Sequence, residues 1–193
     1  DDLNLNAVIS KCDALIVWGG DSTVATFRKL PKKPRCVELY FPDRTSSLVL
    51  NSIEVNNLSE PGLSKLARSF FNDTYLVDSN ACSSPRKIFW VGDQICIEKA
   101  KVRFWVSVNE VLIDKNYELN IVAKLDKYLD VLTSVRQTRQ AIPVKKVSED
   151  IWLAANSYKI VRGRLGRFNE ASFETISGVL ESLEVDEQTL TYY

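Results

Sequence analysis

Short apolar runs alternate with amphipathic helix patterns along most of this chain. Residues 13–18 (Asp-Ala-Leu-Ile-Val-Trp) form a continuous apolar run that is typical of a buried parallel strand, and residues 23–30 follow with apolar side chains at helical spacing. Further strands are predicted at 35–40, 45–50, 87–91, 159–161 and 188–193. Helices are predicted at 61–71, 119–138 and 172–183, and at 95–113, where strand-like alternation competes but length favours a helix. This order predicts an α/β fold with a mostly parallel sheet flanked by helices.

The charge balance and the absence of histidine exclude several classes of function. Of the 193 residues, 25 are Lys or Arg and 25 are Asp or Glu, so the chain lacks the basic excess of a nucleic-acid binder. No stretch approaches the roughly 18 apolar residues of a membrane span. Without histidine there is no Ser-His-Asp triad, no Cys-His dyad and no histidine zinc site. Proton transfer must then come from a carboxylate, Lys, Cys, Tyr or a cofactor.

The cysteines indicate a reducing compartment and no metal site. The chain has four of them, and no pair has the C-x-x-C spacing of a metal or redox site. It carries no signal-like segment, so free thiols in the cytoplasm are expected. Because the chain begins Asp-Asp without an initiator Met, it is expected to be a fragment or a processed form of a longer protein.

The loop at 77–85 is the strongest candidate for a reactive site. It places Cys82 among small and polar residues, between an amphipathic helix and a buried strand. Small neighbours leave room for a substrate carbonyl to approach the sulfur, and backbone N–H groups could stabilise an oxyanion. The thiolate is the nucleophile, so the site also needs a nearby base or a stabilised thiolate. The alternative is a small buried hydrophobic residue, and this interpretation is preferred for Cys12, Cys36 and Cys96.

Four short motifs in a fixed order resemble the aldehyde dehydrogenase superfamily. They are Trp18-Gly-Gly20, Val37-Glu-Leu39, Phe70-Phe-Asn72 and Asn80-Ala-Cys-Ser-Ser-Pro85. In that superfamily a glycine turn near the nicotinamide precedes a strand ending in a catalytic Glu, a helix ending in Phe-Phe-Asn, and the loop of the catalytic Cys. Residues 13–20, the Ala-Cys-Ser-Ser-Pro loop and residues 188–193 resemble most closely the acyl-CoA reductases of the bacterial bioluminescence (LuxC) type. An aldehyde-dehydrogenase-like catalytic domain is therefore expected.

The resemblance implies a role for each matched residue. Cys82 would accept an acyl group as a thioester, which hydride from NADPH would reduce to an aldehyde. Glu38 matches the superfamily's catalytic Glu, and in a reductase it would be a proton relay or a structural residue. The alternative interpretation of Glu38 is a surface carboxylate at the end of a strand. Trp18, Gly19 and Gly20 would face the cofactor, although the two glycines also fit a plain strand-to-helix turn.

The resemblance also divides the chain. Residues 1–36 would be the end of a cofactor-binding domain, and residues 37–193 a truncated catalytic domain. The superfamily's Gly-Gly-Lys after the Glu is replaced here by Tyr40-Phe-Pro-Asp-Arg44. Most of the dinucleotide-binding fold, and the Asn that helps to bind the oxyanion, would lie upstream. The chain alone is therefore expected to carry the nucleophile without turning over.

The function that the resemblance implies is the NADPH-dependent reduction of a fatty acyl-CoA, or of an acyl group on a protein, to the aldehyde. Acyl-transferase and acyl-activating partner proteins and a homo-oligomer are implied as well. Two alternatives remain open. One is a dehydrogenase that oxidises a free aldehyde, with Glu38 as general base. The other is a catalytically silent α/β interaction domain whose cysteines all lie in the core.

Overall fold

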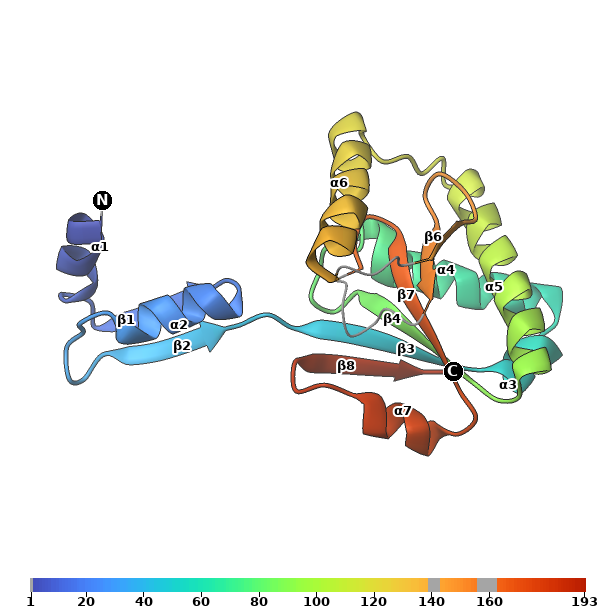
Figure 1. The fold of residues 1–193 in the computed structure, drawn as a ribbon, viewed down its shortest axis with the longest axis horizontal. Coiled ribbons are helices and arrows are strands. Elements are labelled where there is room, and N and C mark those ends of the chain that lie inside the picture. The colour runs from blue at the N-terminus through green and yellow to red at the C-terminus, as the bar shows by residue number, and fades with distance from the viewer. Residues whose placement is uncertain (1, 139–142, 156–162) are drawn as a thin grey trace. The chain divides into compact units, whose positions relative to one another are not determined.

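The computed structural model describes residues 2–138, 143–155 and 163–193 (Figure 1). The chain divides into two compact units, Asp1–Arg44 and Thr45–Tyr193. The strand expected at 35–40 lies in the first unit. The roles assigned to 1–36 and 37–193 stay predictions. The strand expected at 159–161 lies outside the described residues.

The first unit is built on a strand, a glycine turn, a helix and a second strand. Its elements are α1 (Asp2–Ile9), β1 (Ala14–Trp18), α2 (Asp21–Lys29) and β2 (Val37–Phe41). The two strands pair in parallel, with Leu15 opposite Glu38. Val17 of β1 and Val24 of α2 are both buried where the helix packs on the sheet. The predicted strand–turn–helix pattern is therefore confirmed.

The second unit contains a six-stranded sheet in the order β5-β6-β7-β4-β3-β8. All neighbouring pairs are parallel except β5 and β6, which run antiparallel. The strands are β3 (Thr45–Asn51), β4 (Pro85–Val91), β5 (Val144–Lys146), β6 (Trp152–Ala155), β7 (Arg167–Phe173) and β8 (Glu187–Tyr192). The predicted fold class, α/β with a mostly parallel sheet, is confirmed.

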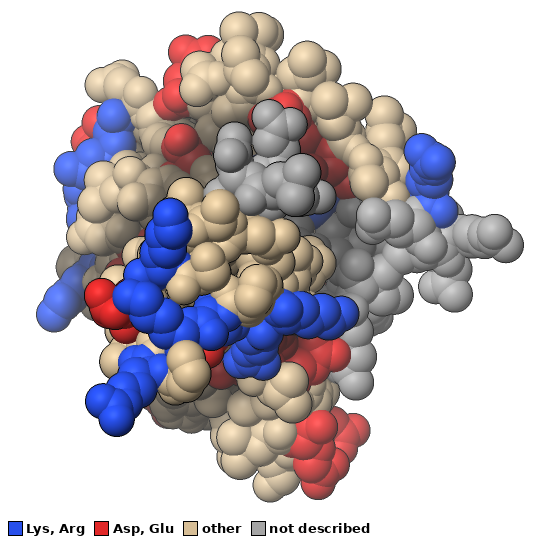
Figure 2. All heavy atoms as spheres, turned by 90° about the vertical axis from the view of Figure 1, so that its left-hand side faces the viewer, with Lys and Arg blue, Asp and Glu red and all other residues tan. Residues whose placement is uncertain are grey.

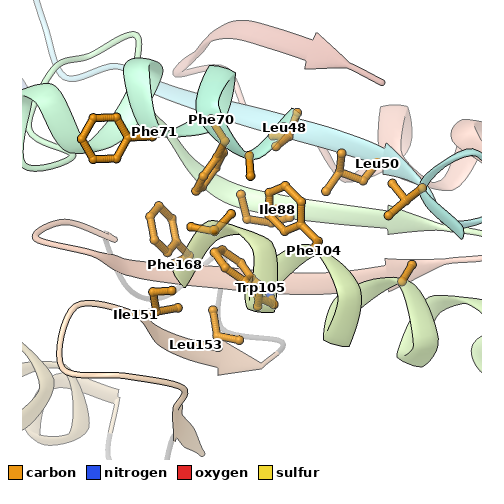
Figure 3. Close-up of a cluster of buried hydrophobic side chains, with 14 of the residues drawn as sticks. Leu48, Leu50, Phe70, Phe71, Ile88, Phe104, Trp105, Ile151, Leu153 and Phe168 are labelled. Atoms are coloured by element: carbon orange, nitrogen blue, oxygen red, sulfur yellow. The ribbon is translucent and has the colours of Figure 1, made fainter. Parts of the chain in front are cut away.

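Helices cover both faces of this sheet (Figure 1). The helices are α3 (Ser52–Asn57), α4 (Glu60–Thr74), α5 (Gln94–Asp114), α6 (Ile121–Thr138) and α7 (Ile176–Ser182). Leu48, Leu50 and Ile88 point to the face under α4 and α5, where Phe70 and Phe104 meet them (Figure 3). The alternate side chains pack with α7 on the other face. Burial on both faces explains the continuous apolar runs at residues 48–50 in β3 and 88–91 in β4. Within the described residues, no helix is long and apolar enough to cross a membrane.

Several elements differ from those expected. The helix expected at 172–183 begins only at Ile176, because Ser172 and Phe173 still belong to β7. The sequence of β7 lacks the apolar pattern of a buried strand, because its buried residues include charged and polar side chains. One of them, Glu170, accepts hydrogen bonds from two tryptophans. The structure also contains α1, α3, β5 and β6, which were not expected. The segment 95–113, ambiguous in sequence, is the helix α5.

Candidate functional site

Cys82 lies in a short loop that joins the end of α4 to the start of β4. After α4 a single 3-10 turn, Tyr75–Val77, leads into the loop, and β4 begins three residues after Cys82 at Pro85. The Cys82 side chain is partly exposed. Ser46 of the neighbouring strand β3 donates a hydrogen bond from Oγ to the Cys82 carbonyl oxygen, 2.7 Å away. The thiol is therefore presented at the amino end of β4, next to the sheet.

The loop opens with two consecutive left-handed residues. Asp78 and Ser79 have φ angles of 52° and 57°, a conformation that few residues other than glycine adopt. The Tyr117 hydroxyl donates to Asp78 Oδ1 over 2.7 Å, and the N–H of Leu165 donates to the Asp78 carbonyl over 3.0 Å. Burial, and then the hydrogen bond to Asp78, raise the pKa of Tyr117 far above its usual range, so it stays a neutral donor. Tertiary contacts thus hold the start of the loop.

The guanidinium of Arg86 holds the middle of the loop. Arg86 is the second residue of β4 and is only 7% exposed. It donates to three consecutive backbone carbonyls, those of Ser79, Asn80 and Ala81, at 3.0, 2.9 and 3.1 Å. These bonds involve a charged donor, which makes them stronger than neutral ones. The loop before Cys82 is therefore tied to the strand that follows it.

All four cysteines are free and partly exposed. The expectation that Cys12, Cys36 and Cys96 are small buried hydrophobic residues is therefore wrong, since each reaches the surface. A side-chain hydrogen bond to Asp93 and burial raise the pKa of the Cys96 thiol, which disfavours its thiolate. Of the four, only Cys82 lies in a loop of small residues between a helix and the sheet.

Glu38 is already engaged within the first unit. The Tyr40 hydroxyl donates to its Oε2, and the Lys32 ammonium lies 3.0 Å from the same oxygen. Lys32 also donates to the carbonyls of Phe27 and Arg28 at the end of α2. The hydrogen bonds from Tyr40 and then Lys32 lower the pKa of Glu38, which makes its carboxylate a weaker base. Tyr40, one of the residues that replace the superfamily's Gly-Gly-Lys, thus binds the Glu itself.

Trp18, Gly19 and Gly20 lie at the carboxyl end of β1, the end at which open parallel sheets bind ligands. Trp18 is 78% exposed, and its ring lies 5.3 Å from that of Phe41. Gly20 caps α2 without a side-chain hydrogen bond. A side chain at Gly20 would meet the carboxylate of Asp43 at 2.9 Å. The Asp43 carboxylate thus lies against the turn, where it also accepts a hydrogen bond from the Asp21 N–H over 3.4 Å.

Figure 2 looks onto the first unit, where Lys and Arg side chains (blue) are prominent. The first unit carries five of them within eight positions, namely Arg28, Lys29, Lys32, Lys33 and Arg35. Lys33 pairs with Asp13 at 2.8 Å, and the Arg28 guanidinium lies 4.9 Å from the centre of the Tyr40 ring. Such a segment suits a ligand that carries phosphate groups.

The candidate residues fall into two groups. Cys82 belongs to the second unit, and Glu38 and the Trp18–Gly20 turn belong to the first. Sequence reasoning missed Ser46 and Arg86, although an Arg directly before an apolar strand was a visible signal. Among the described residues, no group of three or more Cys, Asp or Glu side chains is arranged to hold a metal ion.

Solved enzymes, aldehyde dehydrogenases among them, share this fold. An aldehyde dehydrogenase from Brucella melitensis biovar abortus 2308 matches with a TM-score of 0.61 at 10% identity, over 100% of this chain and 43% of that enzyme. An NADP-dependent enzyme of E. coli matches at 0.58 and 7% identity, over 97% and 46%. The indole-3-acetaldehyde dehydrogenase AldA of P. syringae, in complex with NAD+, matches at 0.59 and 10% identity, over 97% and 42%. The chain thus spans less than half the length of each of these enzymes.

The family assignment comes from the sequence itself. A search of curated protein sequences found no significant match. The family model for acyl-CoA reductase (LuxC) matches residues 2–112, which is more than half of the chain. That match includes the glycine turn, Glu38 and the Cys82 loop, and it agrees with the resemblance noted from the motifs. The chain belongs to the LuxC family of acyl-CoA reductases.

Proposed function

We propose that the protein to which this chain belongs reduces a fatty acyl-CoA, or an acyl group carried on a protein, to the aldehyde through a thioester on Cys82. The observation that carries the proposal is the Cys82 loop, a partly exposed thiol among small residues whose backbone is held by Ser46 and Arg86. Such a loop allows a carbonyl carbon to approach the sulfur and keeps backbone N–H groups in place around it.

The acylation step begins when the Cys82 thiol gives its proton to solvent. The Cys82 thiolate then attacks the acyl carbonyl carbon, and the carbonyl electron pair moves to the oxygen. When the intermediate collapses, the bond to the CoA sulfur breaks, and the CoA thiolate takes a proton from solvent. The acyl group then remains on Cys82 as a thioester.

NADPH is the cofactor that we propose for the reduction, and when bound it would supply the hydride that converts the thioester to the aldehyde. The residues of this chain that would hold it are Trp18, Gly19 and Gly20. The feature that fits a dinucleotide is the exposed Trp18 ring, which lies at the carboxyl end of β1. A nicotinamide cofactor is also named for two of the matching structures, as NADP in one and NAD+ in the other.

The state of Glu38 favours a reductase over an enzyme that oxidises free aldehydes. Oxidation requires a general base to activate water for hydrolysis of the thioester. Glu38 has a lowered pKa and is bound by both Tyr40 and Lys32, which weakens it in that role. We therefore assign Glu38 a structural or proton-relay role. We also propose that the protein works with acyl-transferase and acyl-activating partner proteins, forms a homo-oligomer and lies in the cytoplasm.

The decisive experiment detects the thioester. The 193-residue chain is incubated with an isotopically labelled long-chain acyl-CoA, and its intact mass is measured before and after treatment with neutral hydroxylamine, which cleaves thioesters. We expect one acyl group on the wild type and on Cys96→Ala, and none on Cys82→Ala. No adduct on the wild type would favour the silent domain. An adduct that hydrolyses rapidly, and no longer does so in Glu38→Gln, would favour the free-aldehyde enzyme.

A second measurement tests the completeness of the chain. We expect no aldehyde from the 193-residue chain with acyl-CoA and NADPH, because the matching enzymes are more than twice as long. Aldehyde formation by the chain alone would contradict this expectation.

A further inference from the structure

Arg86 does more than tie the loop to β4, because it also fixes the orientation of the peptide groups that precede Cys82. A single buried guanidinium binds the carbonyl oxygens of three consecutive residues that lead up to Cys82. A peptide group is planar and trans, so its C=O and its N–H point in opposite directions. Fixing these carbonyls therefore also fixes the N–H groups on the other side of the same peptides.

Two of those N–H groups belong to Ala81 and Cys82. The Asn80 carbonyl shares its peptide group with the Ala81 N–H, and the Ala81 carbonyl shares its peptide group with the Cys82 N–H. Since both carbonyls bind Arg86, both N–H groups are directed away from it. Across the described residues, neither N–H donates to a protein acceptor. They form two adjacent free donors at the nucleophile.

We propose that Arg86 is a positioning residue that presents the N–H groups of Ala81 and Cys82 to the oxyanion formed when Cys82 is acylated. This inference rests on the proposed function, in which Cys82 accepts the acyl group. When the sulfur attacks the carbonyl carbon, negative charge develops on the carbonyl oxygen, and preorganised N–H donors stabilise it. Arg86 does not touch the reacting atoms, and it acts through the peptide groups that it orients.

Lysine is the informative substitution because it keeps the positive charge but not the shape. The guanidinium has a planar set of donors that spans three carbonyls, whereas an ammonium is a compact point charge. In Arg86→Lys the charge near the loop remains, and the peptide groups lose their common anchor. Loss of one oxyanion donor typically slows a reaction by about 100-fold to 1,000-fold, so a misplaced pair should slow acylation by about 10-fold to 100-fold.

Arg103 provides a matched control. It also donates to three backbone carbonyls, those of Val55, Asn56 and Leu58 at 3.1, 2.6 and 2.9 Å. Its bonds join α5 to the end of α3 and do not involve the Cys82 loop. Arg103→Lys therefore removes the same kind of anchor at a site without a reactive group.

The test compares two reactions of the same sulfur in the full chain. Acylation by labelled acyl-CoA, and by p-nitrophenyl acetate, passes through an oxyanion. Alkylation by iodoacetamide is a displacement at saturated carbon and forms none. Both rates are read on the Cys82 peptide by mass spectrometry, with circular dichroism melts of each variant. We expect Arg86→Lys to slow both acylations by about 10-fold to 100-fold and to leave alkylation unchanged. Arg103→Lys should change none of the three rates.

The outcomes separate this inference from the proposed function. Equal acylation rates in Arg86→Lys and Arg103→Lys would overturn the role of Arg86, and so would a parallel fall in acylation and alkylation. A wild type that reacts with p-nitrophenyl acetate but not with acyl-CoA would contradict the proposed substrate, while the ester still tests Arg86. If Arg86→Lys does not fold, Arg86→Gln, which keeps a planar side-chain amide donor, is measured in the same way, and selective loss of acylation is again expected.

Discussion

The Ser46 hydroxyl donates a hydrogen bond to the backbone carbonyl of Cys82 across 2.7 Å, which joins β3 to the candidate nucleophile loop. Ser47, the next residue, is equally buried but donates instead to Glu187 Oε2 at 2.8 Å. The register between β3 and β4 shifts between these two serines, so neighbouring residues have different partners. The two serines are therefore a matched pair, of which only Ser46 touches the loop.

We expect Ser46→Ala to lower the free energy of unfolding by about 1 kcal/mol and Ser47→Ala by about 1–3 kcal/mol, because each loses one buried hydrogen bond and that of Ser47 has a carboxylate partner. Only Ser46→Ala should slow the acylation of Cys82, by about 10-fold or less, since it frees one carbonyl and leaves the Arg86 anchor in place. Urea unfolding and the mass-spectrometric acylation rate measure the two effects. Equal slowing in both variants would show that the effect on acylation is one of general stability.

The fold was predictable wherever apolar residues mark buried elements. Residues 45–50 and 87–91 read as strands because helices cover both faces of the sheet there. Residues 13–18 also form a strand, but only Val17 of β1 is buried, and Ile16 and Trp18 are exposed. The strand β7 was not predictable in this way. Its Glu170 is a buried carboxylate that is stabilised by Trp90 and Trp105, which lie 80 and 65 residues away in the sequence. A local pattern contains no information about such partners.

The candidate site was predictable only in part, for the same reason. The small residues around Cys82 and the order of the motifs pointed to the loop. The side chains that hold its backbone were not visible, because Ser46 lies 36 residues upstream and Tyr117 reaches Asp78 from 39 residues downstream. The engagement of Glu38 by Tyr40 and Lys32 likewise depends on how α2 packs beside β2.

The interactions of Glu38 with Tyr40 and Lys32 should make the stability of the chain depend on pH. Glu38 has a lowered pKa in the folded state, so its contribution is present above the unfolded glutamate pKa of about 4.3 and is lost as pH falls through the lower folded value. We expect Glu38→Gln to lower the melting temperature at neutral pH and to have little effect in acid, where the wild-type carboxyl is protonated as well. Thermal melts across this pH range measure the difference.

Tyr40→Phe is the companion variant, since it removes the hydroxyl that donates to Glu38. The double variant should lose less stability than the sum of the two single variants, because both act on one interaction. Neither change should alter the acylation rate of Cys82. A large loss of acylation in Glu38→Gln would contradict the structural role and support a proton relay.

Glu170 should be essential to the core of the second unit. Its Oε1 accepts from the indole N–H groups of Trp90 and Trp105, each at 2.8 Å, and all three residues are buried. Glu170→Leu leaves two buried donors without an acceptor, at about 1–3 kcal/mol each, whereas Glu170→Gln keeps an accepting oxygen. We expect denaturant unfolding, followed by tryptophan fluorescence, to show a much larger loss for Leu. Equal losses would mean that the indole hydrogen bonds contribute little.

Lys127 should oppose folding at neutral pH. It is 2% exposed, donates to the Glu149 carbonyl at 3.0 Å and lies 4.8 Å from the centre of the Trp152 ring. Burial lowers the pKa of Lys127 to about 7, from an unfolded value of about 10.4. Between these values the unfolded chain binds more protons, so stability rises with pH by up to about 1.4 kcal/mol per unit. We expect Lys127→Met to stabilise the chain at pH 7 and to lose this advantage near pH 10.

Lys124, one turn earlier in α6, is the control for this prediction. Its hydrogen bond to Glu118 at 2.6 Å raises the pKa of Lys124, so the pH dependence of its contribution to stability has the opposite sign to that of Lys127. The ion pair then stabilises the fold below the unfolded lysine pKa, and this contribution is lost at more alkaline pH. Lys124→Met should therefore be destabilising at pH 7. Unfolding free energies of both variants, each taken relative to wild type from pH 6 to pH 10, measure the contrast, and a Lys127→Met difference that stays constant over this range would contradict a lowered pKa for Lys127.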